Sequence, residues 1–231
     1  MANPNQDLLI IAAKRVEPLL EEFVFVGGCA TGLLITDEGA GGVRPTVDVD
    51  VIVEVTSYAA YTMLGDRLRE LGFTEDTSEG APMCRWVHGL LKLDVMPLDE
   101  KILGFSNRWY KATIQSAQSV ELEKGLLIWV VTAPYFCATK LEAFKGRGKS
   151  DYLSSHDLED VITVVDGRSE LFEELRMGPS DVRSFVGGFI GQLLQSQKFI
   201  DAIPGYLLPD EASQTRIGEV MLALEQISNL S

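Results

Sequence analysis

One segment of the 231-residue chain constrains its fold more than any other: residues 47–55, where valine alternates with other residue types. This alternation predicts a β-strand, because successive side chains of a strand point to opposite faces. Asp48 and Asp50 fall on the face opposite the valines. Aspartate is depleted in strands, because it competes with the ladder for hydrogen bonds and packs poorly. Two aspartates on one strand face therefore call for an explanation.

Metal binding is one explanation for these aspartates. On a strand the two carboxylates lie about 6.5–7 Å apart, a spacing that suits chelation of one or two hard cations such as Mg²⁺. A third carboxylate, Asp94, lies in the apolar run 90–96, which predicts a second strand. Three carboxylates on neighbouring strands can hold two cations, position a triphosphate and activate an attacking oxygen. The alternative is an amphipathic strand with a solvated acidic face.

A pair of glycines precedes this strand. Gly27 and Gly28 follow a predicted strand at 23–26 and precede a predicted helix at 29–35. Glycine lets backbone amides approach a phosphate closely, and a helix N-terminus adds a positive dipole. The alternative for this pair is an ordinary tight turn.

Charged residues further along the chain share helix faces. Lys140 and Arg147 are seven residues apart on a helix predicted from Pro134 to about Arg147. Asp157 and Asp160 share a face of the next predicted helix, which Ser154 or Ser155 caps and Gly167 ends. Lys140 and Arg147 are candidates to bind phosphates, with Asp157 orienting Lys140. The alternative is a solvated helix surface.

The patterns predict an α/β fold: a small mixed β-sheet with flanking helices in residues 1–132, and a helical region in residues 133–231 that closes over a cleft. The other expected elements are helices at 6–23 and 58–71, strands at 83–87, 120–122 and 126–131, loops at 36–45 and at Gly148-Lys149-Ser150, and helices through 170–231.

Composition excludes several classes of function. Acidic residues outnumber basic ones by 34 to 20, a formal net charge of −14, which repels a phosphate backbone, so no DNA binding is expected. Three scattered cysteines and two histidines supply no zinc site. The N-terminus lacks a signal peptide and no apolar run approaches bilayer length, so we expect a cytoplasmic protein with no membrane contact.

Together these motifs resemble a known signature. The glycine pair after a strand, the Asp48-Val-Asp50 strand and the later Asp94 resemble the polymerase-β-like nucleotidyltransferase superfamily. The segment from Arg44 to Asp50, with Lys140, Arg147 and Asp157 downstream, resembles its bacterial abortive-infection (AbiEii-type) branch, whose members are often toxins of toxin–antitoxin or phage-defence pairs. The resemblance covers roughly residues 23 to 168.

The resemblance implies a role for each matching residue of the catalytic strands. Gly27 and Gly28 would cradle a triphosphate, and Asp48 and Asp50 would bind Mg²⁺ (or Mn²⁺). Asp94 would be the third catalytic carboxylate, a metal ligand that polarises the acceptor hydroxyl.

The resemblance also implies a set of nucleotide-binding residues. Arg44 and Thr46 would line the nucleotide site. Lys140 would contact the phosphates, together with Arg147, and Asp157 would orient Lys140.

We therefore expect an enzyme, a Mg²⁺-dependent nucleotidyltransferase that moves a nucleotide from an NTP to a hydroxyl of an RNA or tRNA end or of a protein side chain. A toxin role with an antitoxin partner follows from the resemblance alone. The alternative is a non-catalytic nucleotide-binding regulatory protein that keeps the same fold.

Overall fold

The computed structural model describes residues 3–147 and 151–230, apart from the side chain of Arg147. The loop predicted at Gly148, Lys149 and Ser150 lies outside the described residues.

The chain divides into two compact units. The sheet unit consists of Pro4–Ala30 and Pro45–Thr132, and the helical unit of Met1–Asn3, Thr31–Arg44 and Ala133–Ser231. One unit boundary falls at residue 132, where the sequence changes character. The segment Thr31–Arg44 groups with the C-terminal helices, which no pattern in the sequence indicates.

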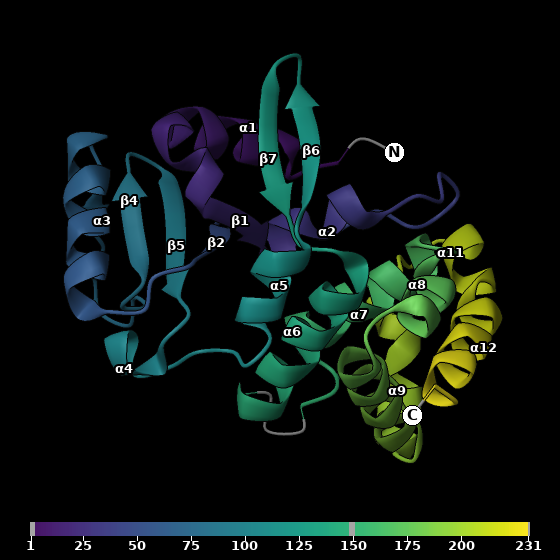
Figure 1. Cartoon of the computed structure of the whole chain (residues 1–231). Helices are drawn as coiled ribbons and strands as arrows, with labels where there is room; N and C mark the ends of the chain where they lie inside the picture. Colours follow the sequence, from purple (N-terminus) through teal and green to yellow (C-terminus); the bar gives the residue numbers. More distant parts are fainter. Residues whose placement is uncertain (1–2, 148–150, 231) are drawn as a thin grey trace. The chain divides into compact units, whose positions relative to one another are not determined.

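A mixed sheet of seven strands, counted over the described residues, forms the sheet unit (Figure 1). Its order is β3-β4-β5-β2-β1-β7-β6, with β2 parallel to β5, β1 parallel to β7 and the other neighbours antiparallel. The strands are β1 (Phe23–Val26), β2 (Val49–Val53), β3 (Thr74–Glu75), β4 (Arg85–His88), β5 (Leu91–Pro97), β6 (Gln118–Glu123) and β7 (Leu126–Val130). The chain is thus a mixed α/β protein, as its patterns predict.

The valine-rich strand is shorter than the sequence predicts. β2 covers Val49–Val53 rather than residues 47–55, because β1 pairs with it only from Asp50 to Val53 and β5 only from Val49 to Val53. Val47 is 71% exposed, and Asp48 lies in the bend before the strand. Ile52 is fully buried on the face expected to be acidic.

Helices complete the sheet unit. The first predicted helix, at 6–23, is wrong as a single element: α1 (Gln6–Arg15) ends before Pro18, and a 3₁₀ helix, η1 (Glu17–Glu22), follows. Proline cannot continue an α-helix because it lacks the N–H donor. α1 packs against β2, β5, β6 and β7. The remaining helices of this unit are α3 (Tyr58–Glu70), α4 (Glu100–Leu103) and α5 (Tyr110–Ser116), of which the sequence predicts only α3.

The helical unit is built from mutually packed helices. α6 (Ala133–Arg147) packs against α7 (His156–Gly167), α8 (Leu171–Met177) and α9 (Ser180–Leu194). α12 (Ile217–Ser228) packs against α7, α8 and α9, and the short elements α10 (Gln197–Ala202), η2 (Ile203–Tyr206) and α11 (Glu211–Thr215) lie between α9 and α12 in the chain. Ser155 caps α7, as predicted, by accepting a hydrogen bond from the amide of Leu158.

The two glycines of the predicted motif begin a helix. α2 (Gly27–Leu34) follows β1 without a loop and begins two residues earlier than predicted.

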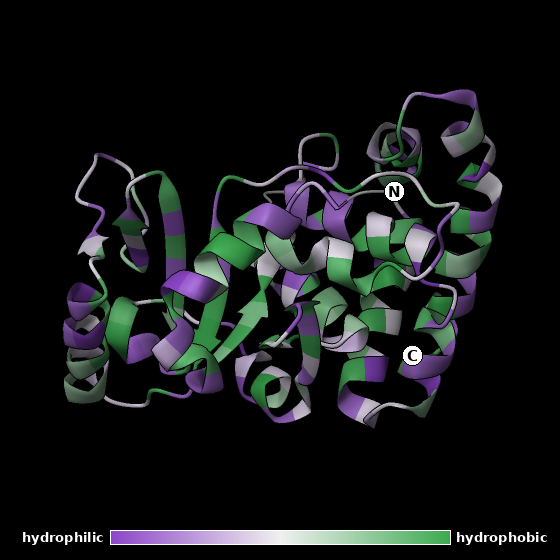
Figure 2. Ribbon diagram, turned by 90° about the horizontal axis from the view of Figure 1, so that it is seen from above, coloured by the Kyte–Doolittle hydropathy of each residue, from purple (hydrophilic) through white to green (hydrophobic). Residues whose placement is uncertain are grey.

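Figure 2 shows hydrophobic and hydrophilic residues alternating along the helices, the pattern of helices that bury one face. Among the described residues, no helix is both long and apolar enough to cross a bilayer.

The central strands make a prediction about stability. Phe25 on β1 is fully buried, so Phe25→Ala removes a large side chain from a close-packed core and should lower the free energy of unfolding by about 3–5 kcal/mol. Leu90 is 99% exposed, and Leu90→Ala should change the free energy of unfolding by less than about 0.5 kcal/mol. Urea unfolding of both variants checks this. Similar losses for the two would contradict the assigned core.

Candidate active site

Two of the predicted aspartates are register partners at the centre of the sheet. Asp50 on β2 pairs with Asp94 on β5, in parallel orientation. Side chains of paired residues point to the same face, and neighbouring strands lie about 4.7–4.9 Å apart. Asp94 is buried and Asp50 is half-buried. The Cα positions of Asp50 and Asp94 are therefore neighbours across the strands, closer than the Cα positions of two residues spaced i, i+2 along one strand.

An arginine outside the predicted set of site residues joins this group. Arg85 on β4 lies opposite Asp94, donating from Nε to Oδ1 and from Nη2 to Oδ2, both at 2.8 Å. Nη2 also donates to Oδ2 of Asp48 at 2.6 Å. The side chain of Arg85 is 14% exposed and that of Asp94 is 8% exposed. The hydrogen bonds to Asp94 raise the pKa of Arg85 against the effect of its burial.

The hairpin explains how Arg85 reaches this place. β4 and β5 are joined at Gly89, whose φ of +61° favours glycine, and His88 pairs with Leu91. Counting back from that turn places Arg85 opposite Asp94. The predicted strands at 83–87 and 90–96 do not contain this signal. Joined at residues 88 and 89, they would pair Val87 with Leu90 and place Arg85 opposite Lys92, because the register of a hairpin follows from its turn.

Gly27 approaches Asp50 rather than open space. Gly27 has a φ of +71°, and a Cβ built on it would lie 1.9 Å from Oδ2 of Asp50. The Asp50 carboxylate thus lies at the N-terminus of α2, where the helix dipole favours a negative charge. Gly28 follows as a buried residue of the same helix.

The thiol of Cys84 lies close enough to this group for its pKa to depend on the charges of the group. Burial, followed by the charges of Asp94 and Asp50, raises the pKa of Cys84 to about 12, and the charge of Arg85 lowers it by less. Three carboxylates face one guanidinium, so these four side chains carry a formal charge of −2. A cation bound by these carboxylates would offset that charge.

Carboxylate oxygens are the ligands that Mg²⁺ prefers, so the donor chemistry fits a metal. Across the part of the chain that the structure describes, no three His, Cys, Asp or Glu side chains converge on a metal position. In the sheet unit, Arg85 instead holds Asp48 and Asp94 through its guanidinium. Convergence of the three carboxylates on a cation requires that these contacts change.

Thr46 shapes the turn that leads into the site. Its amide donates to Oδ1 of Asn5 at 2.9 Å, and its hydroxyl lies 3.3 Å from the carbonyl oxygen of Asp48 as donor. These bonds fix the backbone just before Asp48. A contact of Thr46 with a nucleotide stays a prediction.

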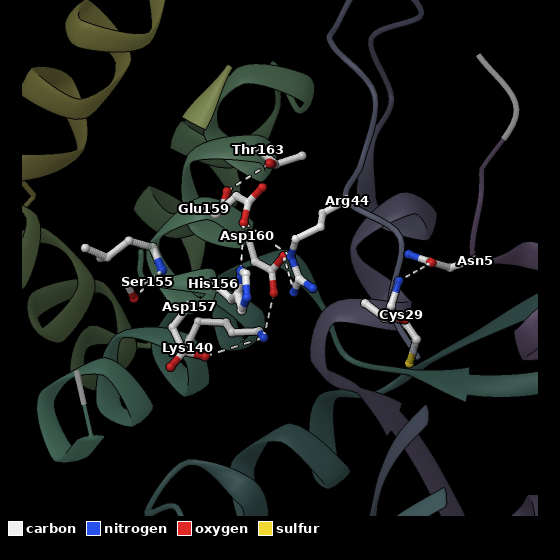
Figure 3. A network of polar contacts seen from close by, with 12 residues as sticks. Asn5, Cys29, Arg44, Lys140, Ser155, His156, Asp157, Glu159, Asp160 and Thr163 are labelled. Atoms are coloured by element: carbon white, nitrogen blue, oxygen red, sulfur yellow. Dashed lines mark hydrogen bonds and ion pairs between the residues drawn. The ribbon is translucent and has the colours of Figure 1, made fainter. Parts of the chain in front are cut away.

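The helical unit brings together a second set of predicted residues (Figure 3). Lys140 on α6 forms ion pairs with two aspartates of α7. Its Nζ lies 2.7 Å from Oδ2 of Asp160 and 3.6 Å from Oδ1 of Asp157. Arg44 lies 3.5 Å from Asp160 and 3.3 Å from Glu159. Asp160, rather than the predicted Asp157, is therefore the closer partner of Lys140.

Burial excludes the solvated-surface interpretation for part of this network. The side chain of Lys140 is 12% exposed, and Asp157 and Asp160 are buried. Arg147 ends α6, and its side chain lies outside the described part of the chain.

The sheet unit also contains a pocket of about 450 Å³, which lies away from Asp48, Asp50 and Asp94. Glu21, Val24, Glu54 and Trp129 contribute to its lining, at the end of β2 opposite Asp50. None of the predicted site residues lines it.

The sequence matches no protein-family model and no curated protein. The function is consequently inferred from the residues of the two groups themselves.

The contact of Gly27 with Asp50 can be tested by paired glycine substitutions. Gly80 has a similar φ of +80°, but a Cβ placed on it would have no heavy atom within 4 Å, so Gly80→Ala should cost only the left-handed strain, about 1–2 kcal/mol. Gly27→Ala must also displace Asp50 and should cost at least about 1 kcal/mol more. Denaturant unfolding measures both. Equal losses would contradict the close approach.

Proposed function

We propose that this chain is a Mg²⁺-dependent nucleotidyltransferase that transfers a nucleotide from an NTP to a hydroxyl acceptor and releases pyrophosphate. One observation carries the proposal: Asp50 and Asp94 are register partners on central parallel strands, with Asp48 two residues before Asp50. Strand interiors seldom bear facing carboxylates, because burial of like charges is costly. A function that needs the negative charge accounts for their presence.

The three aspartates would hold Mg²⁺ or Mn²⁺, which supplies charge neutralisation for the triphosphate and activation of the attacking oxygen. Asp94, the most buried of the three, would accept the proton of the acceptor hydroxyl or polarise it. The amides at the start of α2, at Gly27 and Gly28, would contribute the dipole of that helix to the binding of phosphates, beside the carboxylate of Asp50. Positioning and charge neutralisation would then supply most of the rate enhancement.

Within the helical unit by itself, Lys140 and Arg44 are the candidates for contacts to phosphates. Lys140 and Arg44 are held in place by carboxylates, which fixes their side chains before an NTP arrives. Such preorganised cations suit contacts to phosphate oxygens, and Asp157 and Asp160 would set the orientation of Lys140. Arg147 and Thr46 are proposed as further nucleotide contacts.

The acceptor would be an RNA or tRNA 3′ end or a protein side chain. The net charge of −14 disfavours a large RNA footprint, so contact limited to the end of an RNA, or a protein acceptor, agrees better with the electrostatics. A cytoplasmic toxin paired with an antitoxin is the biological role that the resemblance suggests for such an enzyme.

One observation favours the second candidate, a non-catalytic nucleotide-binding regulatory protein. Arg85 forms ion pairs with Asp48 and Asp94, and an internal counter-cation of this kind can stabilise a carboxylate cluster that no longer binds metal. The two candidates differ in turnover, which a variant without two of the carboxylates can measure.

Removal of two carboxylates tests catalysis. Asp48→Asn combined with Asp50→Asn should abolish Mg²⁺-dependent transfer, because two metal ligands lose their charge, while Arg85 keeps both bonds to Asp94 and the chain stays folded. Transfer of label from each NTP to cellular RNA and protein, together with the melting temperature, measures this. Asp7→Asn with Asp66→Asn, at exposed positions of the same unit, is the control. Wild-type transfer by the double variant would refute the assigned site.

The role of Lys140 is tested by NTP affinity. Lys140→Ala should weaken NTP binding by roughly 1.5–3 kcal/mol, as expected for a charge-assisted contact. Lys198 is exposed on α10, and Lys198→Ala should leave the affinity unchanged. Calorimetric titration with Mg²⁺ present compares the two. Equal NTP dissociation constants for the two variants would contradict the phosphate contact and leave Lys140 only a structural role in its ion-pair network.

A further inference from the structure

Arg85 occupies the carboxylates that the proposed function assigns to a metal. Its guanidinium uses both oxygens of Asp94 and one oxygen of Asp48, and its side chain is 14% exposed. A divalent cation and a guanidinium repel each other and would compete for the same oxygens. Binding of the metal by all three aspartates is therefore coupled to the position of Arg85.

We propose that Arg85 is an exchangeable counter-cation: it holds Asp48 and Asp94 until a metal–nucleotide complex binds, and then transfers its guanidinium to the phosphates of the nucleotide. This inference rests on the proposed function and adds a positioning residue that regulates the same site. The planar fork of arginine matches carboxylate and phosphate oxygens equally well, so the exchange replaces one bidentate contact by another of the same kind.

The charge balance gives Arg85 a reason to be there. Without a counter-cation, the carboxylates of Asp48, Asp50 and Asp94 would repel one another beside a buried strand, which disfavours folding. Arg85 lets the sheet unit fold in the absence of metal. After exchange, Asp48, Asp50 and Asp94 would be neutralised by the metal they hold, and the positive charge of Arg85 would be available to a polyanionic substrate.

The exchange predicts effects of opposite sign in one variant. Arg85→Met removes the competitor, so Mn²⁺ alone should bind roughly tenfold to a hundredfold more tightly, the range expected for loss of a charge-assisted contact. The same variant lacks the phosphate contact, so the four manganese–nucleoside triphosphate complexes should bind more weakly, by at least roughly tenfold for the preferred nucleotide. A purely structural arginine would move both affinities in one direction.

The experiment compares full-length wild type, Arg85→Met, Arg85→Lys and Arg67→Met. Free Mn²⁺ is measured by electron paramagnetic resonance, and binding of each manganese–nucleotide complex by calorimetry. Arg67→Met is the matched control, because Arg67 also pairs with a carboxylate of the same unit, Glu22, at an exposed position. Arg85→Lys keeps the charge without the bidentate fork and should return the Mn²⁺ affinity toward that of wild type.

Each result decides between the two levels of the proposal. Tighter Mn²⁺ and weaker nucleotide binding in Arg85→Met supports exchange. Unchanged or weaker Mn²⁺ binding, with metal bound by wild type, overturns the exchange and leaves the proposed enzyme intact. No Mn²⁺ binding by any of the proteins overturns both.

A measurement on wild type covers the case in which Arg85→Met does not fold. Phenylglyoxal modifies accessible guanidinium groups, and peptide mapping identifies the modified residue. Mn²⁺ alone should raise the modification of Arg85 several-fold, while the modification of Arg67 stays unchanged. A manganese–nucleotide complex should protect Arg85 again. Modification of Arg85 that does not respond to Mn²⁺ overturns the exchange.

Discussion

Three carboxylates beside the core of a sheet need a nearby positive charge, and Arg85 supplies it. Its contacts tie β4, through Arg85, to Asp94 on β5 and to Asp48 before β2. The ion pair therefore links three consecutive segments of the sheet. An isolated buried charge costs several kcal/mol, so this pairing decides whether the aspartates can be accommodated at all. The negative charge that remains on these four side chains is the basis of the proposed cation site.

The sheet topology determines which residues meet at this charge. β2 lies between β1 and β5, parallel to β5 and antiparallel to β1, so Asp50 has Asp94 on one side and Val26 at the end of β1 on the other. β1 continues at once into α2, which brings Gly27 against Asp50. The strand, the glycine turn and the second carboxylate therefore become one site because of pairing, without any loop that must order itself.

Periodicity in the sequence encodes only part of this site. Alternation of valines indicates β2, and the apolar run around Asp94 indicates β5. Periodicity does not encode where pairing stops, so the predicted strand is too long and places Asp48 inside it. Arg85 escapes prediction because a charged residue at a strand start carries no pattern of its own; only the hairpin register places it opposite Asp94. Likewise, α5 has too few turns to show a clear period.

Charge also bears on whether the protein handles a nucleotide with or without a metal. The chain carries −14, and the carboxylate group of the sheet unit keeps a formal −2 after Arg85 is counted. In the helical unit, Arg44 and Lys140 face Asp157, Glu159 and Asp160, so these five side chains also sum to a negative charge. A triphosphate would be repelled by either group alone. The proposed metal would offset this repulsion in either candidate function, so turnover, rather than metal dependence of binding, separates the two.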